Sequence, residues 1–177
     1  MNTNELIKSL TKLSSDPNFN NYRQSSIELI LKNASRSSNL KELIGQVYEF
    51  SDYFADQTNL FKDLIYHDIC GLGPISLFLT FDDWYMITQN GTQNLRIDFQ
   101  NTSPIELSIG LFKNRPPNGI YQLVSRQVKR LDEQFPIFSS LVENLHYQVV
   151  IPPASSNVWI RVIQMNEFKK DWPDYIP

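Results

Sequence analysis

Cysteine is almost absent from this chain, and its scarcity excludes several kinds of site. Cys70 is the single cysteine among 177 residues. One thiol cannot form an intramolecular disulfide or a cysteine-based zinc cluster. The two histidines also lack the HxxxH or HExxH spacing of a metal site. We therefore expect no metal and no cofactor. The lack of a disulfide framework favours a reducing compartment, which we take to be the cytoplasm.

Long apolar runs and an excess of one charge are missing as well. No stretch approaches the roughly 18 apolar residues of a membrane span. The polar N-terminal stretch, MNTNELIKSL, lacks the hydrophobic segment of a signal peptide. The formal net charge of −3 creates no general attraction to nucleic acid or to an anionic membrane. We therefore expect no membrane association, and a protein partner in preference to nucleic acid.

Glycine is also scarce, and two of the six glycines lie in one segment, HDICGLGP, which spans residues 67–74. A dinucleotide or phosphate loop requires a strand before its glycines and a helix after them. Here the order is reversed, because a helical pattern precedes the glycines and an apolar, strand-like run follows them. We interpret Gly71 as the left-handed residue that ends a helix. Gly73 and Pro74 are interpreted as the turn into the first strand.

The same segment places Cys70 within one helical turn of His67. Side chains at this spacing share a helix face, and Asp63, four residues before His67, could orient its imidazole. A thiol nucleophile also needs exposure and an oxyanion site, of which the sequence carries no sign. We interpret Cys70 as a small buried hydrophobe and keep a Cys/His enzyme as a third functional alternative.

The first 70 residues have the apolar periodicity of helices. Apolar side chains recur at spacings of three and four over about 6–13, 18–34, 39–54 and 58–69. Asp16 and Pro17 separate the first two segments, and Asn39 with Glu42 forms a predicted capping box for the third. The pattern predicts a helical lobe over 1–70.

After Pro74 the pattern becomes that of strands. The run ISLFLTF predicts a strand at 75–81, and Asn90-Gly91 suits a tight hairpin between 84–89 and 92–100. Strict alternation continues over 105–111. Two further strands are predicted within 147–153 and 158–165.

A long helix is predicted to interrupt these strands. Apolar residues recur at helical spacing over 120–135, and Pro136 is expected to kink the helix, with a second piece ending near Leu145. The predicted architecture is a single α+β domain over 1–177. About four helices over 1–70 are followed over 74–177 by a mostly antiparallel sheet of five to six strands with the kinked helix before the last two.

Two acids on neighbouring predicted strands resemble part of a metal-dependent nuclease site. Asp98 and Glu106 could hold a divalent ion together on a sheet. The position two after Glu106 is Ser108, however, where such a site needs a lysine, and Lys113 lies too far along the strand to replace it. We interpret both acids as part of a solvated sheet face and keep the nuclease as an alternative.

Basic residues are concentrated on the predicted long helix. Arg126, Lys129 and Arg130 follow the i, i+3, i+4 spacing of one helix face. A stripe of this kind can follow a phosphate backbone or pair with acids on a protein partner. Asp132 and Glu133 come directly after it, which is typical of an ordinary solvated face.

Three aromatic residues complete the candidate binding set. Trp159 alternates with Val158 and Ile160 and therefore points to the second face of its strand. Trp172 and Tyr175 lie in the proline-containing tail, DWPDYIP. Tryptophan and tyrosine are enriched among the residues that carry binding energy at protein interfaces. Each of the three could instead be buried within its own domain.

No complete catalytic constellation can be assembled from these residues, so the sequence favours a non-enzymatic role. We expect a module that binds, and neutralises or escorts, a partner protein, by analogy of size and charge with immunity proteins, antitoxins and secretion chaperones. The predicted binding residues are Arg126, Lys129, Arg130, Trp159, Trp172 and Tyr175. The second alternative is a nucleic-acid-binding or degenerate nuclease-like protein that uses Asp98, Glu106 and the basic helix.

Overall fold

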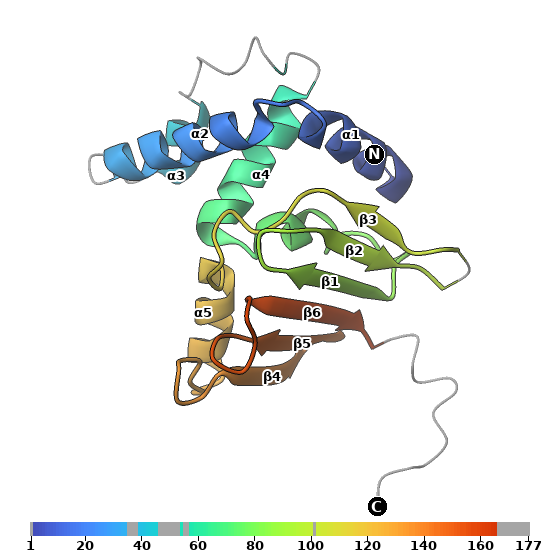
Figure 1. The fold of residues 1–177 in the computed structure, drawn as a ribbon, viewed down its shortest axis with the longest axis vertical. Coiled ribbons are helices and arrows are strands. Elements are labelled where there is room, and N and C mark those ends of the chain that lie inside the picture. The colour runs from blue at the N-terminus through green and yellow to red at the C-terminus, as the bar shows by residue number, and fades with distance from the viewer. Residues whose placement is uncertain (1, 35–38, 46–53, 55–56, 101, 166–177) are drawn as a thin grey trace, which may run out of the picture.

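The computed structural model describes residues 2–34, 39–45, 54, 57–100 and 102–165 (Figure 1). Four helices come first in this part of the chain, and a six-stranded antiparallel sheet follows with a fifth helix inserted in it. The helices are α1 (Thr3–Ser14), α2 (Phe19–Ala34), α3 (Leu40–Gly45), α4 (Thr58–Cys70) and α5 (Asn118–Arg126). The predicted α+β class is confirmed. None of these helices has both the length and the apolar content needed to cross a membrane.

The N-terminal helices form because capping and periodicity agree. At the start of α1, Glu5 N–H donates to Asn2 Oδ1 and Asn2 N–H donates to Glu5 Oε2, both at 2.9 Å, which completes a capping box. One face of α1 then buries Leu6, Leu10 and Leu13. The apolar face of α4, which includes Leu60, Leu64 and Ile65, is buried in the same core. For the third predicted helix, α3 covers the beginning, and residues 46–53 lie outside the described ranges.

The segment after α4 differs from the prediction. Residues 75–81 do not form a strand; Gly73–Leu77 is a short 3₁₀ helix, η2, whose Ile75 is buried. The left-handed glycine is Gly73, with φ +63°, whereas Gly71 has φ −101°. Gly71 is needed for space, because a Cβ there would lie 2.7 Å from the imidazole of His67 and from Ser76 Oγ. Gly71 does follow the last residue of α4 as predicted, but the left-handed conformation occurs at Gly73.

All neighbouring strands of the sheet are antiparallel, in the order β3-β2-β1-β6-β5-β4. The strands are β1 (Met86–Asn90), β2 (Leu95–Asp98), β3 (Ile105–Leu107), β4 (Ile137–Val142), β5 (Leu145–Val150) and β6 (Trp159–Gln164). The predicted hairpin between the strands on either side of Asn90-Gly91 is confirmed, and Gly91 has φ +53°. The two predicted final strands are β5 and β6.

The predicted long kinked helix is wrong in extent. Helix α5 ends at Arg126, and Val128 has φ +53°, a conformation that a continuing helix does not allow. Residues 137–142, predicted as the second half of the helix, form β4 instead. Glu143, with φ +55°, turns β4 tightly into β5.

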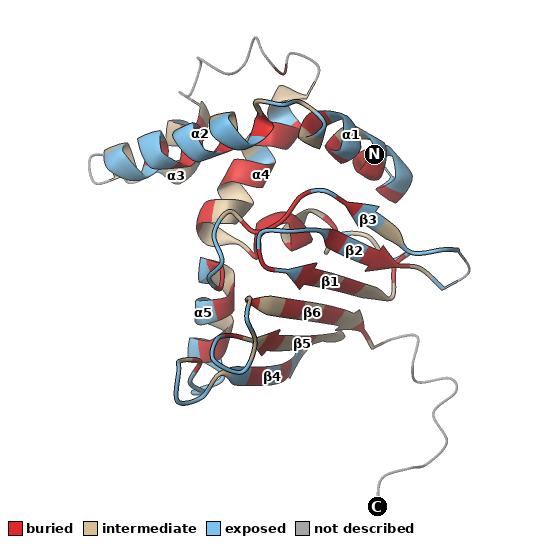
Figure 2. Cartoon of the chain, in the orientation of Figure 1, coloured by how far each residue is buried: buried red, intermediate tan, exposed pale blue. Residues whose placement is uncertain are grey.

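The two faces of the sheet differ in burial (Figure 2). The inner face carries Phe138, Val149, Ile160, Ile87 and Ile97, all at most 2% exposed, and belongs to one continuous core with the helices and η2. The residues between them point to the opposite, outer face and are half-buried or exposed, except Asp98, which is buried. A sheet with one dry face and one wet face is the usual antiparallel arrangement.

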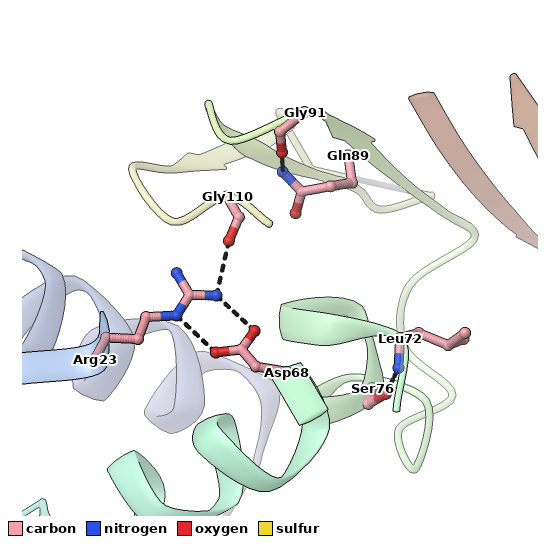
Figure 3. Close-up of polar contacts among 7 residues, drawn as sticks. All are labelled: Arg23, Asp68, Leu72, Ser76, Gln89, Gly91 and Gly110. Carbon is pink, nitrogen blue, oxygen red and sulfur yellow. Dashed lines mark hydrogen bonds and ion pairs between the residues drawn. The ribbon is translucent and has the colours of Figure 1, made fainter. Parts of the chain in front are cut away.

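A buried ion pair joins the helices to the loop after β3 (Figure 3). Arg23 on α2 donates from Nε and Nη2 to the two carboxylate oxygens of Asp68 on α4, at 2.7 and 2.6 Å. Its Nη2 also donates to the Gly110 carbonyl at 2.9 Å. The two side chains are 4% and 1% exposed. Arg23 therefore fixes three segments that are far apart in the sequence.

Candidate functional site

The outer face of the sheet gathers the most distinctive exposed side chains. Because paired residues of antiparallel strands share a face, the register places them in rows across the sheet. The middle row crosses all six strands, in the order Ser139, Gln148, Arg161, Thr88, Arg96 and Glu106. A row on each side contains apolar residues: Ile137, Val150 and Trp159 on one, and Leu141, Ile163 and Met86 on the other. Ile137 and Leu141 are exposed, and the other four are half-buried.

Arg161 and Trp159 lie at the centre of this face, on β6. The guanidinium carbon of Arg161 is 4.6 Å from the centroid of the Trp159 ring, a cation–π stack. The Nε atom of Arg161 is buried and has no hydrogen-bond partner within the structure. No carboxylate among the described residues forms an ion pair with Arg161. The tryptophan therefore positions the guanidinium, and no acid in the described ranges neutralises its charge.

Apolar side chains flank the stack on both sides. Ile137 and Leu141 on β4 are 65% and 57% exposed, and Ile163 and Val150 are half-buried. Phe135, just before β4, is also 50% exposed. Exposed apolar surface next to a tryptophan and an arginine is typical of a protein-binding site.

A serine and a histidine also meet on this face. Ser139 Oγ and His146 Nε2, from the paired strands β4 and β5, are 2.8 Å apart. A serine nucleophile additionally requires a group that orients the histidine and donors for an oxyanion. Among the described residues, no acid forms a hydrogen bond with His146. The pair therefore orders the edge of the sheet and does not assemble a catalytic triad.

The structure brings Asp98 and Glu106 together, but around an arginine. Arg96 lies between them and donates to both carboxylate oxygens of Asp98 at 2.8–3.1 Å, and its Nη1 is 3.9 Å from Glu106 Oε1. Asp98 is buried, whereas Glu106 is exposed. No group of three or more potential metal ligands occurs among the residues that the structure describes. Arg96 therefore balances the charge of Asp98 and makes only a longer contact with Glu106. The predicted solvated position holds for Glu106 and is wrong for Asp98, which is buried.

The three basic residues do not form a stripe on a helix. Arg126 is the last residue of α5, and Lys129 and Arg130 lie in the following loop. Lys129 Nζ donates to the Ser139 carbonyl at 2.7 Å, and Arg130 pairs with Asp132 at 2.8 Å. All three are exposed. The prediction that these three residues share one helix face is wrong, because α5 ends at Arg126, before Lys129 and Arg130.

Cys70 and His67 occupy the last turn of α4 but do not form a reactive pair. Cys70 Sγ donates to the Tyr66 carbonyl at 3.2 Å, and burial raises the pKa of its thiol. His67 lines an open hollow with Asp63, Lys62, Tyr66 and Ile44, and Cys70 does not line it. Burial lowers the pKa of His67, and the charges of Asp63 and Asp68 oppose this effect. A thiol with a raised pKa is a poor nucleophile at neutral pH.

Two predicted binding residues, Trp172 and Tyr175, lie outside the described residues. Arg161 was not among the predicted binding residues, although the sequence carries a usable signal for it. Arg161 follows Trp159 by two positions on a strand, and this spacing places both side chains on one face. The comparisons with known proteins add no assignment: no protein-family model matches the chain, and no curated protein sequence matches it significantly.

Proposed function

We propose that this chain is a non-catalytic protein-binding module. Its outer sheet face binds a partner surface that presents a carboxylate surrounded by apolar side chains. The observation that carries the proposal is Arg161, which is stacked on Trp159 and has no acidic partner within the described chain. The Arg161–Trp159 stack and its apolar flanks, Ile163 and Val150, form what we call the outer-face site.

The chemistry of the partner follows from the unmet requirements of this site. The Arg161 guanidinium is held against Trp159 and has no counter-charge among the described residues, and a carboxylate on the partner would supply one. Arginine and carboxylate groups are geometrically matched for two parallel hydrogen bonds. The aliphatic side chains around the stack would lose contact with water in the same step, which contributes the hydrophobic part of the affinity. Arginine and tryptophan are also the residues most often found at the energetic centre of interfaces.

We further propose a biological role for this binding. A chain of this size and mild negative charge fits a cytoplasmic protein that neutralises or escorts its partner, as immunity proteins, antitoxins and secretion chaperones do. The identity of the partner separates these roles, since a toxin supports the first two and an exported protein supports the last.

The test compares charge reversals at two arginines. The wild-type chain is used to isolate partners from its native host, and each captured protein is then purified and titrated against Arg161→Glu, Trp159→Ala and Arg126→Glu. We expect Arg161→Glu and Trp159→Ala to weaken binding by about 30-fold or more, the size of a hot-spot loss. Arg126→Glu carries the same charge change away from the outer-face site and should alter the affinity by less than about threefold.

Two results would contradict the proposal. One is a partner that binds Arg161→Glu as tightly as the wild type but loses affinity for Arg126→Glu, which would favour a site at the end of α5. The other is nucleic acid as the sole stoichiometric ligand, with binding that falls steeply as salt is raised. Circular dichroism of each variant shows whether the fold is retained.

A further inference from the structure

Strand β4 forms one edge of the sheet, and its own residues offer little to block that edge. The strand, IFSSLV, contains no charged residue and no proline. The hydrogen bond from Ile151 N–H to the Pro136 carbonyl, at 2.9 Å, sets the alternation of the β4–β5 ladder. The residues bonded to β5 are consequently Phe138, Ser140 and Val142. The backbone groups of Ile137, Ser139 and Leu141 therefore point away from the sheet.

A contact made by Lys129 agrees with the outward direction of these backbone groups. Lys129 Nζ donates to the Ser139 carbonyl at 2.7 Å, so this carbonyl is directed outward at the edge. Lysine near an edge strand is a common means of limiting uncontrolled strand pairing. Here it covers a single carbonyl in the middle of the strand and is itself exposed.

We propose that β4 pairs with β4 of a second copy of this chain, antiparallel and centred on Ser139, to give one continuous sheet across the dimer. In this register Ser139 faces Ser139 of the other copy, and Ile137 faces Leu141. These are the two most exposed apolar residues of the strand, at 65% and 57%. Each would therefore meet an apolar partner, and the Lys129 ammonium must leave the central Ser139 carbonyl as the ladder forms.

The register is tested by cysteine cross-linking in a Cys70→Ala background. Facing residues of a hydrogen-bonded antiparallel pair have Cα atoms about 5.5 Å apart, within the range of a disulfide. We expect S139C to form an intermolecular disulfide under mild oxidation. I137C is the matched control, because its two copies would lie about 13 Å apart, four residues along the ladder. Equal cross-linking of both variants, or of neither, would overturn the register.

Association itself is measured by sedimentation velocity across the micromolar range. We expect reversible dimers, abolished by Ser139→Pro, which removes the outward N–H and leaves the β5 ladder intact. Ser139→Ala loses the same hydroxyl but should still form dimers. Lys129→Ala should lower the dimer dissociation constant about tenfold, because the Ser139 carbonyl is freed. Leu141→Asp gives a second disruption if the proline variant does not fold.

A chain that stays monomeric as both wild type and Lys129→Ala would refute the proposal. A dimer that survives both Ser139→Pro and Leu141→Asp would also refute it, because another surface would then be responsible. This dimer does not depend on the outer-face site. Arg161→Glu should leave the dimer unchanged, so the two proposals can fail separately.

Discussion

Replacing Arg23 should strongly destabilise the protein, because its charged side chain is buried and paired with a buried carboxylate. Arg23→Met keeps the length of the side chain but deletes three hydrogen bonds, two to Asp68 and one to the Gly110 carbonyl. It leaves a carboxylate that is 1% exposed without its counter-charge. Breaking a buried ion pair from one side costs about 3–5 kcal/mol. We therefore expect the free energy of unfolding to fall by about 4 kcal/mol at pH 7.

The assay is urea denaturation followed by circular dichroism, with a double variant as control. Arg23→Met/Asp68→Leu removes both charges and should recover at least about half of the loss, because no uncompensated carboxylate remains in the core. A loss below about 1 kcal/mol for Arg23→Met would refute the reasoning, since it would mean that Asp68 remains solvated or is neutral without Arg23.

The pH dependence of the same variant has a definite sign. Burial raises the pKa of Asp68, and the charge and hydrogen bonds of Arg23 oppose that rise. Without Arg23 the folded-state pKa should rise further above the unfolded value of about 3.9. The folded variant then favours the protonated acid, so its stability is greatest below pH 4 and falls as the pH rises through the raised pKa. The deficit relative to the wild type should therefore be small near pH 4 and largest at pH 7.

Two further changes test the close contacts of the fold and the state of the thiol. Gly110→Ala should cost about 3 kcal/mol or more or prevent folding, because its Cβ would lie 2.1 Å from the Thr92 carbonyl carbon. Gly45→Ala, with nothing within 4 Å, should be neutral or stabilising in the same thermal melt. Cys70 should react with a thiol reagent at pH 7 at least about tenfold more slowly than in denaturant, because burial raises its pKa. Rapid reaction of the folded protein would instead reopen the Cys/His alternative.

The parts of the fold that the sequence predicted are those specified locally. The helices α1, α2 and α4 carry their own apolar stripes and breakers, and the hairpin around Gly91 is encoded by a residue pair that favours positive φ. The strand predicted at 75–81 was wrong because a short apolar run does not distinguish a strand from a buried helical turn. The Arg23–Asp68 pair was also beyond sequence reasoning, since its members lie 45 residues apart on different helices.

Strand β4 was predicted as helix, so the sequence did not indicate that its residues Ile137 and Leu141 lie on the outer face of the sheet. Phe138, Leu141 and Leu145 follow a helical spacing, which is why the segment was predicted as helix. In the structure the strand directs Phe138 and Ser140 inward and Ile137, Ser139 and Leu141 outward, so each face mixes apolar and polar residues, unlike a regular half-buried strand. Local rules are broken most often where a surface is shaped for binding rather than for stability alone. The outward-facing Ile137 and Leu141, which obscured the strand in the sequence, are also the residues on which the proposed β4–β4 pairing rests.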